Sequence, residues 1–170
     1  MSMTSIRAAT PRDRAAIRLV EEHAFGQQAE AGLVDALVAN GDAVVELVAV
    51  EEGQVVGHIL FSRLYIAENG QEFPAVALAP LAVEPSFHGS GIGGALIREG
   101  HLRLKQAGES LSIVLGDPAY YGRFGYAHGR AAGFDSEFQG DALQAVSWQA
   151  APNAGRLVYA SAFSNPAVAA

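Results

Sequence analysis

The sequence predicts an α+β domain whose sheet is mixed but mostly antiparallel, with flanking helices and one βαβ crossover. Two features carry this prediction. Three apolar β-type runs follow one another between residues 44 and 83 and are joined by turn signals, which is typical of an antiparallel meander. A glycine-rich helix start then leads to another β run roughly 30 residues later, which is the length of one βαβ unit with parallel strands.

Two helices are expected before the meander. Residues 5–8 favour a short first strand. Thr10 has the character of a helix N-cap, because Pro11 follows it at the first helical position, where its missing N–H costs nothing. Apolar residues at helical spacing then predict a helix to about Phe25. The same spacing predicts a second helix over residues 29–38, which an Asn-Gly pair ends.

The meander is expected over residues 44–50, 55–64 and 75–83. A Glu-Glu-Gly-Gln segment joins the first two runs. Asn69 and Gly70, a strong signal for a tight hairpin turn, separate the second run from the third. All three runs are almost wholly apolar, so both faces of this part of the sheet are expected to be covered.

The crossover helix is expected over residues 93–107, because its apolar and small residues share one face and a glycine follows its end. Residues 110–115 form the next predicted strand. Asp117 and Pro118 then have the character of an N-cap and a first helical position, which predicts a short helix to about Phe124.

The rest of the chain carries weaker signals. Short β runs are predicted at residues 133–138, 143–148 and 157–163, and residues 165–170 are expected to fray. No linker or internal repeat divides the sequence. Residues 1–170 are therefore expected to form a single domain, a length that suits one hydrophobic core.

Composition argues against several classes of function. The formal net charge of −7 at pH 7 disfavours a nucleic-acid partner, whose phosphates an acidic surface repels, and mildly favours cationic amines. The absence of cysteine removes disulfides, thiolate catalysis and cysteine-type zinc sites. No apolar run is long enough to span a membrane, and the first residues do not resemble a signal peptide. A cytoplasmic protein without a membrane partner is the simplest interpretation.

The most informative segment is the glycine-rich start of the crossover helix. A helix N-terminus carries unpaired N–H groups and about half a positive charge, so it attracts phosphate. Gly89, Gly91, Gly93 and Gly94 leave the backbone open to close approach. The last two lie inside the helix, where each costs about 1 kcal/mol of helix propensity relative to alanine. Such a cost indicates a close contact, either with a pyrophosphate, which we favour, or with the sheet beneath the helix.

A dinucleotide-binding oxidoreductase is an alternative interpretation of the same segment. Gly89, Gly91 and Gly94 match G-x-G-x-x-G, and Asp117 lies downstream where such folds place a ribose-binding acid. That fold, however, places the glycines directly after a strand in a repeating βαβ array, whereas the strands before this segment look antiparallel. A P-loop fits less well, since no Lys-Ser or Lys-Thr pair follows the glycines.

Two segments together resemble the signatures of the GNAT superfamily of N-acetyltransferases. In residues 81–97, the strand Leu-Ala-Val precedes His-Gly-Ser-Gly-Ile-Gly-Gly at the helix start, close to the family pattern Q/R-x-x-G-x-G/A. In residues 116–126, a tyrosine pair precedes Gly-Arg-Phe-Gly-Tyr. The form Asp-Pro-x-Tyr-Tyr-x-Arg-Phe-Gly is similar to a bacterial branch described as YhbS-like N-acetyltransferases. The order of elements up to Tyr126 also agrees, so the resemblance implies a GNAT-like fold for most of the chain.

The resemblance assigns the binding of the cosubstrate acetyl-CoA to the first of these segments. Leu81, Ala82 and Val83 would pair through their backbone with the pantetheine arm, in a gap where this strand splays from the next. Pro80 cannot donate a ladder hydrogen bond, which fits disturbed pairing there. His88 departs from the family pattern, because Gln or Arg is usual and histidine lacks the bidentate reach of arginine toward phosphate. The amides that would receive the pyrophosphate belong to Gly89, Ser90, Gly91, Ile92, Gly93 and Gly94.

Acetyl transfer from a thioester needs an acid to protonate the leaving thiolate. Tyr121 matches the family's usual thiolate-protonating tyrosine, and a phenol with a pKa of about 10 is protonated at neutral pH, as an acid must be. Packing among neighbouring aromatic residues is the structural alternative for Tyr121. Tyr120 is expected to be structural or to line the substrate site. Because no cysteine is present, direct transfer is expected rather than an acyl-enzyme.

The general base is not evident from the sequence. Some family members carry a glutamate midway along the central strand, but Ala77 occupies that position here. Glu84 and His58 are candidates, although His58 lies within an apolar run, where a hydrogen-bonded core histidine is the commoner outcome. A water chain is a further alternative.

Acceptor and metal sites have weaker support. Glu21, Glu22 and Phe25, at the end of the first helix, lie where the family often builds its acceptor site, but a solvated helix end is the simpler interpretation. No metal site is predicted, because the histidines show no ligand spacing. They are His23, His58, His88, His101 and His128.

The resemblance therefore implies an N-acetyltransferase that transfers acetyl from acetyl-CoA directly to a primary amine. An antibiotic, a polyamine, an amino acid and a protein N-terminus all remain open as acceptors, as does an acyl group other than acetyl. A non-catalytic acyl-CoA-binding or regulatory domain of the same fold is the alternative from another class. Dimerisation is common in the family, so a homodimer is compatible with the resemblance.

Overall fold

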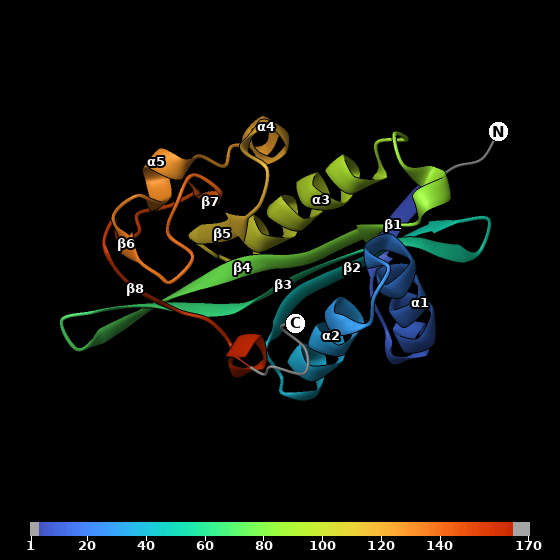
Figure 1. Ribbon diagram of the computed structural model, residues 1–170, viewed down its shortest axis with the longest axis horizontal. Coiled ribbons are helices and arrows are strands. Elements are labelled where there is room, and N and C mark those ends of the chain that lie inside the picture. The colour runs from blue at the N-terminus through green and yellow to red at the C-terminus, as the bar shows by residue number, and fades with distance from the viewer. Residues whose placement is uncertain (1–3, 165–170) are drawn as a thin grey trace.

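An eight-stranded sheet organises the computed structural model of the protein, which describes residues 4–164 (Figure 1). The tail predicted at residues 165–170 lies outside the described residues. The main path of the sheet runs β1, β2, β3, β4, β5, β7, while β8 pairs with both β3 and β6. The strands are β1 (Thr4–Ala8), β2 (Ala43–Glu51), β3 (Gln54–Glu68), β4 (Gln71–Val83), β5 (Leu111–Leu115), β6 (Phe134–Asp135), β7 (Leu143–Ser147) and β8 (Gly155–Val158).

The predicted meander is confirmed and is longer than the sequence pattern indicated. Strands β2, β3 and β4 pair antiparallel in consecutive order. The β3–β4 hairpin closes with Glu68 opposite Gln71. Asn69 and Gly70 between them have φ angles of 52° and 77°. Two consecutive left-handed residues match the right-handed twist of the flanking strands, which is why this dipeptide specifies a tight hairpin.

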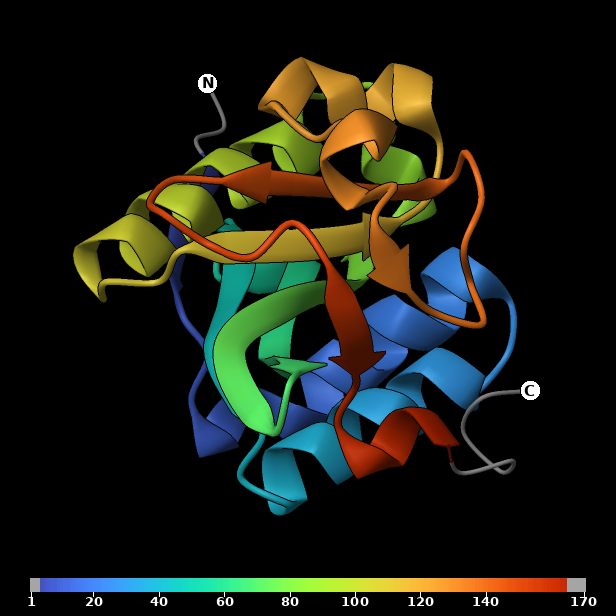
Figure 2. The same cartoon turned by 90° about the vertical axis from the view of Figure 1, so that its left-hand side faces the viewer.

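Helices cover both faces of the sheet, as the apolar runs predicted (Figure 2). Helices α1 (Arg14–Phe25) and α2 (Ala29–Ala39) pack on one face, with Ile17, Val34 and Leu60 in their shared core. Helix α3 (Ile92–Gln106) packs on the other face, where Leu96 and Ile97 join a separate core with residues of β2, β3 and β4. Burial of apolar side chains on both faces explains the near absence of alternation in these strands.

Helix α3 forms the single predicted crossover. It connects β4 to β5, which pair in parallel, and Gly108 ends it with a φ angle of +83°. The other neighbouring pairs on the main path are antiparallel. Off the main path, the short strands β6 and β8 also pair in parallel. A mostly antiparallel sheet with these two parallel pairs does not fit the doubly wound sheet that a dinucleotide fold requires, so that alternative is wrong.

Close packing of α3 on β3 explains a glycine that the sequence alone did not. A Cβ at Gly100 would lie 2.4 Å from the Phe61 ring. Gly100→Ala is therefore expected to lower the free energy of unfolding by about 1–3 kcal/mol, the usual cost of overpacking. Chemical denaturation measures this loss. Gly129→Ala is the matched control, because a Cβ there meets nothing within 4 Å, and an equal loss in both variants would contradict the packing account.

The C-terminal quarter departs from the predictions. The β run at residues 143–148 is confirmed as β7, but the run at residues 133–138 is a strand only at Phe134–Asp135. The prediction of one strand over residues 157–163 is wrong, because β8 ends at Val158. Ser161–Ser164 is instead a 3-10 turn that packs against α2. Apolar runs this short have no periodicity that separates strand from helix.

Short helical segments complete the fold, among them the 3-10 turns Pro11–Asp13 before α1 and Pro85–Phe87 before α3. The segment predicted as one short helix divides into α4 (Pro118–Tyr121) and the 3-10 turn Gly122–Phe124. Helix α5 (His128–Ala131), which was not predicted, packs on β7. No helix within residues 4–164 has the length and apolar character needed to cross a membrane.

Candidate functional site

Strands β4 and β5 separate, and the separation leaves one edge of β4 open. They pair only over residues 76–78 of β4 and residues 112–114 of β5. Beyond that point β4 stays paired with β3, after a bulge in β4 at residues 79–80. The N–H of Glu84 donates to the carbonyl of Val56 on β3 at 2.8 Å. Because backbone direction alternates along a strand, the N–H and C=O groups of Leu81 and Val83 face away from β3, into the gap.

A glycine-rich turn lies at the end of this open edge. Gly89 and Gly91 have φ angles of 81° and 86°, which favour glycine. Gly91 is the N-cap of α3, and it has no side chain that could accept a hydrogen bond from the first N–H groups of the helix. The first bond of the helix runs from the Ala95 N–H to the Gly91 carbonyl at 3.0 Å. The N–H groups of residues 92–94 precede it and point out of the helix end, which is therefore a site for an anion.

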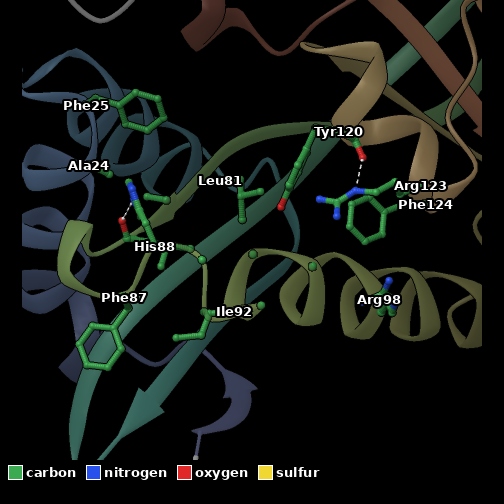
Figure 3. A pocket seen from close by; sticks show the side chains of 16 residues that line it. Ala24, Phe25, Leu81, Phe87, His88, Ile92, Arg98, Tyr120, Arg123 and Phe124 are labelled. Atoms are coloured by element: carbon green, nitrogen blue, oxygen red, sulfur yellow. Dashed lines mark hydrogen bonds between the residues drawn. The ribbon is translucent and has the colours of Figure 1, made fainter.

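A cavity of about 560 Å³ joins the open edge to this turn (Figure 3). Side chains from α1, β4, α3 and the segment after β5 converge on it. The described residues that line it are Ala24, Phe25, Leu81, Ala82, Val83, Phe87, His88, Gly89, Gly91, Ile92, Gly93, Gly94, Arg98, Tyr120, Arg123 and Phe124. Of the ten residues predicted from the first motif, the structure thus brings together all except Ser90.

Positive charge gathers at one end of the cavity, which sequence reasoning missed. The guanidinium carbons of Arg98 and Arg123 lie 4.9 Å and 5.5 Å from the centre of the Phe124 ring. Arg123 also lies 4.7 Å from the centre of the Tyr120 ring. Stacking on aromatic faces fixes arginines without using their fork of N–H donors. In a chain of net charge −7, two such arginines in the lining of the cavity next to a helix N-terminus give it local positive charge, which attracts anions.

His88 lies at the opposite end of the glycine turn and contacts β4 instead of the helix. Its Nε2 is 2.9 Å from the carbonyl oxygen of Val83, so the ring donates a hydrogen bond to one of the groups that face the gap. Figure 3 shows this bond as a dashed line. A ligand N–H that pairs with the Val83 carbonyl would compete with this contact or share the oxygen with it.

The two tyrosines of the second motif occupy different places. A Cβ at Gly93 would lie 2.6 Å from the Tyr120 hydroxyl, so this hydroxyl reaches the start of α3 across the cavity (Figure 3). Tyr121 is not among the described lining residues. Its ring packs where a Cβ at Gly116, just after β5, would lie 2.5 Å away, and its centre is 5.9 Å from that of Tyr126. Tyr121 therefore lies on the β5 side of the separation, and its predicted catalytic role stays a prediction.

Burial affects both phenols. It raises the pKa of Tyr121 to about 12, and the neighbouring Tyr120 contributes in the same direction. Burial also raises the pKa of Tyr120, against the effect of the positive charges of Arg123 and Arg98. Both side chains are therefore protonated at neutral pH and are able to donate a proton.

The candidate bases lie outside the cavity lining. His58 is fully buried and hydrogen-bonded to Glu21 and Glu46. Glu84 is paired with His23 on α1, with 2.8 Å between Oε1 and Nδ1.

The three residues at the end of α1 that were considered for the acceptor-amine site lie in different environments. Phe25 lines the cavity, and Glu22 pairs with Arg18 at 3.6 Å. Glu21 is fully buried, so a solvated helix end is the wrong interpretation for this residue.

Asp117 accepts a hydrogen bond from the Ala119 N–H at 2.9 Å, which makes it the N-cap of α4. Among residues 4–164, no group of three or more His, Asp or Glu side chains could hold a metal ion.

The arrangement suits an elongated ligand with phosphates at one end. The helix start and the arginines can hold the phosphates, and the open edge of β4 can pair with an amide-bearing arm. The arm would lead to the point where β4 and β5 separate. A backbone N–H in that gap can stabilise negative charge that develops on a carbonyl oxygen.

Comparisons with known proteins agree with this geometry. A family model described as the acetyltransferase (GNAT) domain matches residues 5–129. The chain is 37% identical over 155 residues to the uncharacterized N-acetyltransferase YhbS of Escherichia coli K12, covering 84% of this chain and 92% of that protein.

Two solved structures are similar over nearly the whole chain. The crystal structure of a GNAT family acetyltransferase from Brucella melitensis in complex with acetyl-CoA has a TM-score of 0.81 and 38% identity, and covers 95% of this chain and 98% of that one. The structure of Escherichia coli YhbS in complex with CoA has a TM-score of 0.86 and 29% identity, and covers 98% of this chain and 94% of that one.

Proposed function

This chain belongs to the GNAT family of N-acetyltransferases, and from that premise we propose that it transfers an acetyl group from acetyl-CoA directly to a primary amine. The observation that carries the proposal is one cavity in which the open edge of β4 meets the uncapped N-terminus of α3. The whole chain, residues 1–170, would act as one catalytic domain. The Brucella melitensis relative in complex with acetyl-CoA supports this choice of cosubstrate.

The coenzyme would extend along the cavity. Its pyrophosphate would accept hydrogen bonds from the amides of residues 89–94, where the positive end of α3 favours two negative charges. Arg98 and Arg123 would add charge-assisted contacts to phosphate. The pantetheine amides would pair with the groups of Leu81 and Val83 that face the gap, as an added strand does.

The thioester would lie where β4 and β5 separate. We propose that the Leu81 N–H donates to the thioester oxygen, because a fixed backbone donor costs no reorganisation as negative charge develops. Tyr121, on the β5 side of the gap, would donate its phenolic proton to the departing thiolate. Tyr120 lines the cavity and is the competing candidate for this role. The amine would enter from the side of Ala24 and Phe25.

An amine panel tests the proposed function. Release of CoA from acetyl-CoA would be followed with benzylamine, phenylhydrazine, spermidine, kanamycin and a peptide with a free N-terminus. We expect at least one amine to accelerate release above the rate of hydrolysis without amine, with the acetylated amine as product. Release that no amine accelerates would contradict the proposal.

A further inference from the structure

Four ionisable side chains form a buried network between α1, β2 and β3. His58 Nδ1 is 2.7 Å from Glu21 Oε2, and His58 Nε2 is 2.7 Å from Glu46 Oε2. Glu46 also accepts a hydrogen bond from Arg14. His58 and Glu21 are fully buried, and the Glu46 side chain is 11% exposed. We call this set the Glu21–His58 network.

The two short contacts of His58 fix the number of protons in the network. Each contact joins a ring nitrogen to a carboxyl oxygen and requires one hydrogen between the two atoms. The imidazole carries both hydrogens, or one of them lies on a carboxyl group. In either case the three groups together carry one negative charge, which Arg14 balances. Burial lowers the pKa of His58, but hydrogen bonds that the ring donates to both carboxylates, together with their charges, raise it overall, which agrees with a doubly protonated ring.

One acceptor in this network is left open. Glu21 Oε1 is buried and has no hydrogen-bond partner among the described residues. Burial raises the pKa of Glu21, and the hydrogen bond and charge of His58 oppose that shift. The charged groups that act on the Glu21 carboxyl group are His58 on β3, Glu46 on β2 and Glu30 on α2. A buried ion pair that served packing alone would be expected to satisfy each of its oxygens, whereas this oxygen is able to take one more proton.

The network lies directly behind the wall of the cavity. Glu21 precedes the lining residues Ala24 and Phe25 by three and four positions on α1, so the three side chains share one face of the helix. His58 pairs in register with Ala82 of β4, another lining residue. Each of the two elements next to the network thus contributes an alanine, the smallest side chain that carries a Cβ, to the cavity lining.

We propose that the Glu21–His58 network takes up the proton that the acceptor's ammonium group must lose before it attacks the thioester. The inference rests on the proposed function and adds the base that the sequence did not reveal. The proton would reach Glu21 Oε1 through water from the side of Ala24. Glu21 is thus a proton-accepting residue behind the site, and His58 positions it.

The proton balance of the reaction defines when this network is needed. A protonated alkylamine loses one proton to Glu21 and attacks as the neutral amine. The new C–N bond forms, the C–S bond breaks, and the thiolate receives a proton from Tyr121. The nitrogen of the new amide loses its second proton, and this proton restores the Tyr121 phenol. The network then returns its proton to solvent, so that R–NH3⁺ and acetyl-CoA give the amide, CoA and H⁺. An amine that is already neutral omits the first step.

The test compares two acceptors of similar size that differ in basicity. Benzylamine is protonated at neutral pH, whereas phenylhydrazine is a much weaker base and is mostly neutral. Glu21→Gln keeps the size of the side chain and an oxygen that can accept from His58. We expect it to lower kcat for benzylamine by on the order of 10²-fold, and kcat for phenylhydrazine by less than about threefold. His58→Gln is expected to show the same selectivity, and Glu21→Asp, which keeps the carboxyl group, to recover part of the rate.

Glu109→Gln is the matched control, because Glu109 also forms a largely buried ion pair, with Arg63 at 2.8 Å, and does not line the cavity. Its kcat should equal that of the wild type for both amines. Equal losses for both amines in the Glu21 and His58 variants would indicate a structural role and overturn the inference, as would unchanged rates. A wild-type protein that acetylates no amine of the panel overturns the proposed function, and this inference with it.

Discussion

Gly91→Glu is expected to abolish measurable binding of acetyl-CoA. Gly91 is the N-cap of α3 with a φ angle of 86°, at the point where the amides of the turn would meet the pyrophosphate. A glutamate there adds a negative charge to the site of two others and strains a left-handed backbone position. Like charges brought together in this way cost several kcal/mol, so Kd should rise by on the order of 10²-fold or more. Calorimetric titration with acetyl-CoA measures the change.

Gly70→Glu separates the loss of the site from general damage. Gly70 has a φ angle of 77° in the exposed β3–β4 turn and does not line the cavity, and a Cβ there meets nothing within 4 Å. That turn lies at the end of β4 opposite the end that leads to α3 (Figure 1). Gly70→Glu therefore imposes the same kind of backbone strain and the same added charge as Gly91→Glu. Its Kd for acetyl-CoA should match that of the wild type. If both variants bind acetyl-CoA as the wild type does, the glycine turn is not where the coenzyme phosphates lie.

Tyr121→Phe is expected to lower kcat by on the order of 10²-fold while leaving the Kd for acetyl-CoA unchanged. The reason is that the phenol would donate its proton to the thiolate only as the C–S bond breaks, and not when acetyl-CoA binds. Burial holds the pKa of Tyr121 at about 12, so its acid form persists well above neutral pH. The rate should therefore show no decline from this group between about pH 7 and pH 10. Steady-state kinetics with the best amine of the panel provides both measurements.

Two further tyrosine variants sharpen this test. Burial also raises the pKa of Tyr159 to about 12, but Tyr159 packs in the core beyond β5 and does not line the cavity. Tyr159→Phe should therefore keep the full rate. Tyr120→Phe tests the competing hydroxyl, which lies at the start of α3. A large loss of kcat in Tyr120→Phe together with a normal rate in Tyr121→Phe would move the role of acid to Tyr120.

Local signals in the sequence predicted the elements that build the site. The Asn69–Gly70 turn specified the hairpin, and Pro80 correctly indicated disturbed pairing with the next strand, because β4 pairs with β5 only up to Leu78. The glycines at the start of α3 predicted an open helix end, and the structure places them in the cavity. Each of these signals works over a few residues, because backbone conformation at a glycine or proline is a local property.

Side-chain partners distant in the sequence could not be predicted in this way. Glu21 meets His58 only because α1 packs on β3, and Glu46 meets it only through the register of β2 and β3. Arg98 and Arg123 come together around Phe124 because α3 and the segment after β5 are neighbours. None of these contacts has a periodicity or spacing that a single sequence displays. Whether α5 and the 3-10 turn Ser161–Ser164 form helical turns or strands likewise depends on which core their apolar side chains enter.

The central claim is that one cavity along β4 and the start of α3 holds acetyl-CoA. Calorimetric titration of the wild-type protein with acetyl-CoA, and with NAD in a parallel experiment, tests it most directly. We expect one acetyl-CoA to bind per chain with a micromolar Kd, and no heat of binding with NAD. Absence of acetyl-CoA binding, or binding of NAD in its place, would contradict the assignment of this cavity.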